Sequence, residues 1–426
     1  MNAQTSKLKS LRLIIFITYY LGFTSFCSAE EDLSSVEKRG EGKVQLIKYS
    51  NGHWQLLLEG SPYLIKGITY EPVKVGDRLD FSNKWMSYDF NNNGINDTAY
   101  ESWVDENKNN RRDRNEKVIG DFQLLKEMGI NTIRIYHPVN INKELLRDLY
   151  NRFGIRVIMG NFLGAYCRGS GASWRKGTDY TNPQHLENMI NDVRKMVLEF
   201  KDEPYILVWL LGNENDVSGN YENSTFNNTN ARFYPGEFAK FVNEVARLIH
   251  SLDPEHPVGI CNATTSFLKY YAQYAPELDF VGFNAYLGPF GFDSLYRTVK
   301  FDFDRPVLIT EYGVDAYNQK KKCEDEFLQL IYHRGCWRSI ERNSFGARGV
   351  GNAIGGIIHT WLDPWWQCGS ERIHDKRRGA WQGSSPDGWF NDEWLGICSQ
   401  GNGRNSPYLR QLRKVYFFYQ REWRQR

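Results

Sequence analysis

Two carboxylic acids stand at the ends of apolar runs in this sequence. The run 206–212 contains no polar side chain and continues directly into Asn213 and Glu214. A second run, 307–310, continues into Glu311. A pair of carboxyl groups can cleave a glycosidic bond, because one protonates the leaving oxygen while the other attacks the sugar or activates water. Burial at a strand end also helps to separate the pKa values of two such acids. The pair therefore predicts acid/base and nucleophilic chemistry on a glycoside.

Each glutamate alone has a simpler explanation. An acid at a strand end often caps the next helix or pairs with an arginine. Here the first acid follows an asparagine, Gly313 comes shortly after the second, and Trp361 ends a third apolar run. Together these residues favour a catalytic site over two unrelated structural acids.

The elements that must position these acids alternate between β-rich runs and helical patterns from about residue 63 onward, which is typical of βα units. Eight strands are expected, at residues 63–70, 131–137, 155–162, 205–212, 257–261, 279–286, 306–311 and 353–361. Helices are expected at 117–128, 143–152, 183–200, 235–251 and 325–343, and a final one at 407–422 would close the ring.

Eight such units predict an α/β fold, a (β/α)8 TIM barrel, over residues 63–426, with a lead-in at 30–62. Strands four and seven then place Glu214 and Glu311 across the mouth that the carboxyl ends of the strands form. An open doubly wound sheet is the alternative. It normally has a glycine-rich phosphate turn after its first strand, whereas residues 67–72 lead into a long polar insertion.

This insertion, residues 80–116, contains two segments that resemble the calcium loops of EF-hand and dockerin-like repeats. Residues 105–116 have the twelve-residue spacing of such a loop, and Asn110 stands where glycine usually makes the turn. The earlier segment, which begins at Asp89, repeats the pattern, except that its last acid, Glu101, stands at the thirteenth position and not at the twelfth. A polar surface loop is the simpler alternative. The predicted ligands to a structural calcium ion are Asp105, Asn107, Asn109, Arg111, Asp113 and Glu116 in one loop, and Asp89, Asn91, Asn93 and Asp97 in the other.

The charge balance and the absence of several motifs argue against other classes of protein. Lys and Arg number 53 and Asp and Glu 51, so the net charge of +2 gives no field for nucleic acid. No P-loop, dinucleotide turn, H-E-x-x-H or G-x-S-x-G motif is present, and the cysteines lack the spacing of zinc ligands. Aromatic residues make up 15% of the chain, which suits stacking on the flat faces of sugars. We expect a carbohydrate substrate and no cofactor for catalysis.

The N-terminus has the features of a signal peptide, residues 1–29. Basic residues precede the apolar stretch 13–26, which is short for a membrane span, and small residues follow it. We expect a secreted or periplasmic protein without a stable membrane span in the mature chain. Lipid attachment at Cys27 is disfavoured by the bulky Phe26 before it. Export permits disulfides, and a bond between Cys368 and Cys398 is expected to tie a C-terminal loop.

The segments 209–214 (WLLGNE) and 309–313 (ITEYG) resemble clan A of the glycoside hydrolases. The similarity is greatest to the catalytic barrel of family 2, the group of β-galactosidases, β-glucuronidases and β-mannosidases. It extends to residues 63–70, 131–134 and 281–286. The first two of these three segments also resemble family 72 glucanosyltransferases, and family 5 shares the acid pair.

The resemblance implies roles for individual residues. Glu214 would be the acid/base and Glu311 the nucleophile of a retaining hydrolase of β-linked glycosides. The implied substrate-binding or supporting residues are Asn213 for the sugar 2-hydroxyl, Arg134 and Tyr286 for aiming the nucleophile, and Trp361 as a floor under the sugar. His137 is a candidate hydroxyl ligand, or alternatively a core histidine.

Family 2 enzymes carry β-sandwich domains before the barrel, whereas here the barrel is expected soon after the leader, which puts single-sugar specificity in question. A β-glucan transglycosidase would use the same site. A non-catalytic carbohydrate-binding barrel is a further alternative, but such a barrel usually loses one of the two acids. A structural or signalling role at the cell surface would not explain the pair of acids. The tryptophan-rich segment 361–394 is expected to wall a substrate cleft, or to be a surface loop held by its own aromatic cluster.

Overall fold

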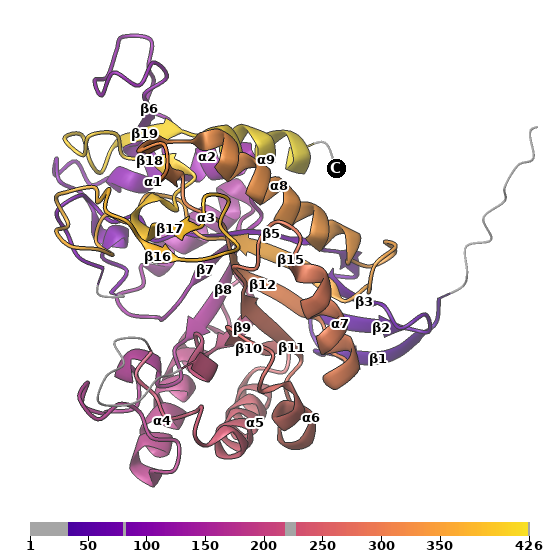
Figure 1. Ribbon diagram of the computed structural model, residues 1–426. Coiled ribbons are helices and arrows are strands. Elements are labelled where there is room, and N and C mark those ends of the chain that lie inside the picture. The colour runs from indigo at the N-terminus through magenta and orange to yellow at the C-terminus, as the bar shows by residue number, and fades with distance from the viewer. Residues whose placement is uncertain (1–32, 80–81, 218–226, 425–426) are drawn as a thin grey trace, which may run out of the picture.

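The computed structural model of the protein describes residues 33–79, 82–217 and 227–424, and its core is a closed parallel barrel (Figure 1). The barrel confirms all eight predicted strands, each within its expected range or one residue beyond it. In barrel order they are β5 (Ile65–Thr69), β7 (Thr132–Ile135), β8 (Arg156–Asn161), β9 (Ile206–Leu211), β10 (Val258–Asn262), β11 (Phe280–Asn284), β12 (Val307–Tyr312) and β15 (Ala353–Ile358). Nearly every strand residue is buried, as expected of parallel strands covered by helices.

Helices follow most of the strands. They are α2 (Asp121–Met128), α3 (Lys143–Phe153), α4 (Pro183–Phe200), α5 (Pro235–Leu252), α6 (Leu268–Tyr274), α7 (Phe292–Asp302), α8 (Glu326–Arg342) and α9 (Lys414–Arg424). The start of α4 shows why the sequence predicts it well: Asn182 accepts backbone hydrogen bonds from the first turn, and Pro183 occupies the first helical position.

The last helix begins later than predicted. Residues 407–422 were expected to be helical, but β19 (Leu409–Leu412) occupies the start of that range. This strand pairs with β18 (Cys398–Ser399) and with β6 (Trp103–Val104). Because β19 pairs with a strand on each side, its backbone N–H and C=O groups are hydrogen-bonded. This gain outweighs the local preference of the segment for helix. The small sheet also joins the insertion after β5 to the C-terminal segment.

The predicted lead-in forms a four-stranded antiparallel sheet, β1 (Ser35–Arg39), β2 (Val44–Tyr49), β3 (Trp54–Leu58) and β4 (Ser61–Pro62). Its buried residues Leu46 and Trp54 belong to the same apolar cluster as Leu308 and Ile357 of the barrel strands. Figure 1 shows β1–β3 at one end of the barrel and the short strands β16 (Ala380–Trp381) and β17 (Trp389–Phe390) at the other. The sheet therefore closes the end of the barrel opposite the expected active site.

Short elements complete the loops. They are α1 (Asp97–Glu101), β13 (Tyr317–Asn318), β14 (Cys323–Glu324) and the 3-10 turns η1 (Lys84–Ser87), η2 (Ala165–Cys167), η3 (Asn215–Val217) and η4 (Asp392–Trp394). No helix in the described part of the chain is both long and apolar enough to span a membrane. The predicted signal peptide lies outside the described residues.

The expected disulfide between Cys368 and Cys398 is wrong. All six cysteines in the described residues are free thiols. Cys398 is buried in β18, where it pairs with Leu412 of β19. The backbone N–H of Cys368 is bound instead to the carboxylate of Glu393, 3.0 Å away. Both ends of the loop are thus fixed by hydrogen bonds that sequence spacing does not reveal.

Candidate active site

Glu311, in β12, is an ionised carboxylate at the centre of the barrel mouth. Tyr136 Oη donates to its Oε1 at 2.6 Å, Tyr286 Oη donates to its Oε2 at 2.8 Å, and Arg134 Nη1 donates to Oε1 at 3.1 Å. Burial by itself raises the pKa of Glu311, but the neighbouring positive charges and the two phenolic hydrogen bonds outweigh it and hold the pKa below its ordinary value. Because burial lowers the pKa of His359, Arg134 is the cation that acts at neutral pH.

Arg134, in β7, connects Glu311 to Asn213, the residue before Glu214. Its guanidinium is 1% exposed and donates to Glu311, to the Thr310 carbonyl at 2.9 Å and to Asn213 Oδ1 at 2.9 Å. The predicted role of Arg134 in holding Glu311 is supported by this geometry. A planar donor with several fixed partners positions two strand ends at once.

Glu214 lies just beyond β9 in a contrasting environment. Among the described residues, its side chain accepts one hydrogen bond, from Asn284 Nδ2 to Oε1 at 2.8 Å. Burial, followed by the negative charge of Glu311, raises the pKa of Glu214 to about 8. Its backbone is in the left-handed region, with φ of 57°, and is fixed by a bond from its N–H to the Cys261 carbonyl. At neutral pH one acid of the pair is therefore protonated and the other ionised.

Asn213 shares a hydrogen-bond partner with each of the two acids, Arg134 with Glu311 and Asn284 with Glu214. Its Oδ1 accepts from Arg134 and from Asn284 Nδ2, at 2.9 and 3.1 Å, and its Nδ2 donates to Tyr166 Oη at 3.2 Å. Both ends of the amide are thus oriented by protein contacts. Its predicted bond to a sugar hydroxyl stays a prediction.

Two predicted binding residues differ in their placement. His137 is 6% exposed, its ring stacks on Phe162, and its Nδ1 is buried with no partner among the described residues. Its position after β7 remains compatible with a substrate contact. Trp361 is 1% exposed and packs near Tyr416 in the core. The residue after β15 that approaches Glu311 is His359, whose Nδ1 is 4.0 Å from Glu311 Oε2.

Sequence reasoning assigned no role to four residues of the site: Tyr136, Asn284, His359 and Glu71. Tyr136 stands two places after Arg134 in the same predicted strand, and this spacing puts both side chains on one face of the sheet. The spacing could therefore have indicated that Tyr136 belongs to the site. Glu71 is the first acid after the run 63–70, the same signature as Glu214. It lies close enough to Glu311 and Arg134 to interact with their charges, and burial is the main cause that raises its pKa to about 8.

The predicted calcium loop 105–116 is folded around its own oxygen atoms. Asp105 accepts from the backbone N–H groups of Asn109 and Asn110, while the side-chain amides of Asn107 and Asn109 both donate to Asp113 Oδ2. Asn110 has a φ of 63°, as its place in the predicted turn requires. The carboxylates and amides are the hard oxygen donors that calcium prefers.

The earlier loop is similar but uses a different acid. The amides of Asn91 and Asn93 donate to Glu101, at 2.9 and 2.7 Å. Asp97, a predicted ligand, accepts instead from the N–H of Phe90 and from Tyr408 Oη. Across the described residues, no three His, Cys, Asp or Glu side chains gather as a metal-binding group. Calcium binding would therefore depend on asparagine and backbone oxygens, and it stays a prediction.

Facing acids on strands four and seven of a closed (β/α)8 barrel define the class of this protein as a TIM-barrel protein with a glycosidase-like site. The model of the glycosyl hydrolases family 2, TIM barrel domain, matches residues 104–337, more than half of the chain. The chain belongs to this family, as the resemblance in the sequence implied.

Individual relatives are distant. A β-galactosidase from Priestia megaterium is 28% identical over 114 residues, which are 25% of this chain and 10% of the relative. The β-D-glucuronidase of Dictyoglomus thermophilum superposes with a TM-score of 0.54 and 17% identity, over 91% of this chain and 53% of that one. A galacturonate-bound β-galacturonidase from Eisenbergiella tayi superposes with a TM-score of 0.51 and 20% identity, over 92% of this chain and 54% of that one. The chain thus spans a tenth of its curated relative and about half of these solved structures.

Proposed function

We propose that this protein is a retaining glycosidase of β-linked glycosides, with Glu311 as the nucleophile and Glu214 as the acid/base. The observation that carries the proposal is the contrast between the hydrogen-bond partners of two acids in one site. Three donors hold Glu311 ionised, whereas burial and the charge of Glu311 keep Glu214 protonated. Membership of family 2 supports the same reaction class.

In the first step, a carboxylate oxygen of Glu311 forms a bond to the anomeric carbon as the glycosidic bond breaks. The proton of Glu214 passes to the departing oxygen, so the alcohol leaves neutral and a glycosyl ester remains on Glu311. Arg134, Tyr136 and Tyr286 keep the attacking carboxylate ionised and fixed in direction until the bond forms.

The second step reverses the roles. Ester formation removes the charge of Glu311, which is the second-largest cause of the raised pKa of Glu214. Its pKa therefore falls once the ester exists, and the carboxylate now present suits a general base. It takes a proton from water as the water oxygen bonds to the anomeric carbon and Glu311 is released. A sugar hydroxyl in place of water gives transglycosylation, so product sizes distinguish the two outcomes.

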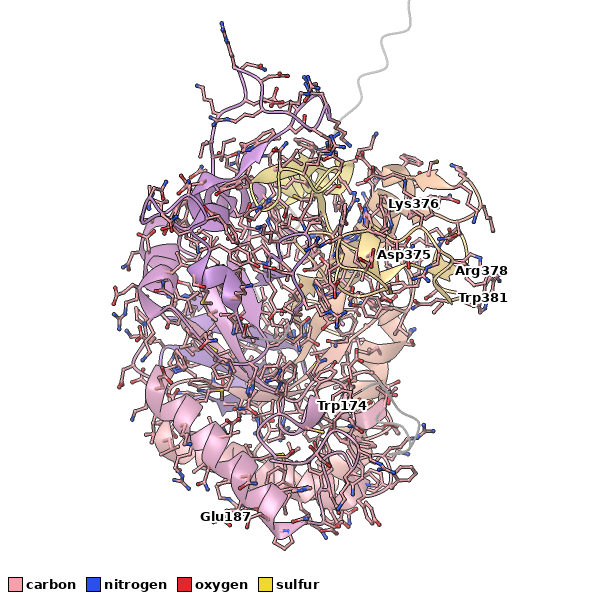
Figure 2. The ribbon with its side chains drawn as sticks, turned by 90° about the vertical axis from the view of Figure 1, so that its left-hand side faces the viewer. Trp174, Glu187, Asp375, Lys376, Arg378 and Trp381 are labelled. Atoms are coloured by element: carbon pink, nitrogen blue, oxygen red, sulfur yellow. The ribbon has the colours of Figure 1, made fainter. Side chains whose placement is uncertain are left out.

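The test replaces each acid and adds azide, a nucleophile that needs no base. Glu214→Ala retains the nucleophile, so on an aryl β-glycoside azide restores turnover and gives a β-azide. Glu311→Ala lacks the nucleophile, and azide attack from its side gives an α-azide. The control is Glu187→Ala, because Glu187 is exposed on α4, away from the mouth (Figure 2), and should leave turnover unchanged. Exchanged products would exchange the roles, and full activity in both variants would disprove the proposal.

A further inference from the structure

Strands β16 and β17 form a hairpin, residues 380–390, that presents an exposed tryptophan. Trp381 pairs directly with Trp389 across the two strands, and their rings meet edge to face at 5.2 Å. Trp381 is 69% exposed, which presents a large apolar surface to water. Figure 2 shows Trp381 and Arg378 together at the outer edge of the C-terminal segment. We call residues 380–390 the tryptophan hairpin.

The orientation of Trp381 is fixed although it is exposed. Gly388 has a φ of +87°, and a Cβ at this position would lie 2.5 Å from Trp381 Cζ3, so the indole rests on a backbone that only glycine provides. Trp389 is covered from another side by the guanidinium of Arg378, 3.3 Å from its ring centroid. The exposed ring is therefore a preorganised surface, which lowers the entropy cost of binding a flat ligand.

The tryptophan hairpin is attached to the catalytic site through one residue. Gln382 Nε2 and Ser384 Oγ both donate to the Tyr286 carbonyl, at 3.0 and 2.7 Å. The ring of Phe390 meets the ring of Tyr286 at 5.2 Å. The hydroxyl of the same tyrosine donates to Glu311. One side chain thus contacts both the nucleophile and the hairpin, so the exposed indole lies on a structure continuous with the catalytic mouth.

We propose that the tryptophan hairpin binds the sugar units next to the one that is cleaved, so that the natural substrate is an extended β-linked glycan. The proposal rests on the proposed function and deepens it. The apolar face of a pyranose ring stacks on an indole, and exposed Trp in a fixed orientation suits such a ligand. A single-sugar glycoside held between Glu214 and Glu311 would leave Trp381 unused.

The test measures binding without turnover. Full-length Glu311→Ala protein is titrated calorimetrically with cello-, laminari- and manno-oligosaccharides and with aryl β-monoglycosides. We expect at least one oligosaccharide series to bind more tightly as its length increases. Adding Trp381→Ala should weaken binding of the longer members about tenfold, a loss typical of one stacked aromatic contact. Trp381→Phe should restore most of that affinity.

The matched control is Phe301→Ala in the same background. Phe301 is 90% exposed at the end of α7 and has no part in the proposed site, so oligosaccharide affinity should not change. In the active enzyme, Trp381→Ala should also lower the ratio of kcat/KM for the oligosaccharide to that for the aryl glycoside.

Affinity that does not rise with length, absence of oligosaccharide binding, or equal effects of Trp381→Ala and Phe301→Ala would each overturn the proposal. This would indicate that the exposed indole serves another occupant, such as a protein partner. The proposed function has a separate readout in the azide products. Turnover of aryl glycosides without length-dependent binding would reject the hairpin site and keep the glycosidase.

Discussion

At the residue scale, two glutamates with the same chemistry receive different partners. Glu311 accepts hydrogen bonds from two phenols and a guanidinium, all of which favour its charged form. Glu214 accepts one hydrogen bond, from an amide, which is too weak to offset burial. Burial and the nearby charge of Glu311 therefore raise the pKa of Glu214. The opposite pKa shifts of the two acids follow from these partners and not from the residue type.

If the proposed roles of the two acids are right, the pH dependence of kcat/KM should reflect them. Glu214 must carry a proton in the first step, so activity on a natural glycoside should fall as pH rises through about 8. Glu311 must be ionised, so the acid limb should lie below the ordinary glutamate value of 4.5. An aryl glycoside with an acidic phenol should show a weaker alkaline limb, since it needs less acid assistance. An alkaline limb of equal size with both substrates would contradict the assignment of Glu214.

Tyr136→Phe tests a residue that sequence reasoning did not assign. Losing the 2.6 Å bond to Glu311 removes a donor that favours the carboxylate, so the pKa of Glu311 should rise and the acid limb should move to higher pH. A hydrogen bond to a charged group contributes about 1.5–3 kcal/mol, so kcat/KM should fall roughly tenfold to a hundredfold. Tyr63→Phe is the control, because its hydroxyl bonds to the Asn131 carbonyl outside the active site. A loss of activity without movement of the acid limb would mean that Tyr136 acts only through packing.

At the element scale, the insertion after β5 and the C-terminal segment depend on each other. The side chain and carbonyl of Asn110 accept from Asn402 N and Asn405 Nδ2, both at 2.7 Å. Gln411 Nε2 donates to Asp105 at 2.8 Å. Loop 105–116 thus supports the segment that continues into β19 and α9.

Chelation tests whether calcium holds this loop. If the ion binds only the folded state, exhaustive EDTA treatment should lower Tm, and added calcium should restore it in a concentration-dependent way. Glu116→Gln should reduce the calcium effect, because it removes a charged ligand from the twelfth position. Glu106→Gln, an exposed neighbour, should respond to calcium like the native chain. Equal Tm values with EDTA and with calcium would show that the hydrogen bonds of the loop suffice.

At the scale of the whole molecule, a buried ion pair joins the first barrel helix to the end of the chain. Arg410 Nε and Nη2 donate to the two oxygens of Asp121 at 2.7 and 2.8 Å, and neither side chain is exposed. Ser102 Oγ and Tyr70 Oη also donate to this carboxylate, at 2.8 and 3.0 Å. The pair therefore connects β19, α2, the insertion and the residue after β5.

Asp121→Ala should be strongly destabilising, because it leaves the Arg410 charge buried without its partner. The expected loss is about 3–5 kcal/mol of unfolding free energy, measured by denaturant titration. Glu237→Ala is the control, since it removes an exposed pair with Lys240 and should cost roughly 1 kcal/mol or less. Similar unfolding midpoints for the two variants would show that water reaches Arg410 once Asp121 is gone.

The sequence by itself predicted the eight barrel strands and the acids Glu214 and Glu311 at their ends, and the family resemblance implied Arg134 and Tyr286. Short apolar runs, their order and the polar residues that end them are local features, and the barrel count then fixes which strand ends share the mouth. The family match agrees with this interpretation.

Only the tertiary structure decided the rest. Tyr136 and Glu311 are 175 positions apart, and although the spacing from Arg134 places Tyr136 on the same face, only the fold shows that its hydroxyl reaches Glu311. The same holds for β19, whose pairing partners are distant in the sequence, and for His359, whose approach to Glu311 no local pattern predicted. The opposite protonation of the two acids also required the fold, because desolvation and neighbouring charges arise only when separate strands pack together.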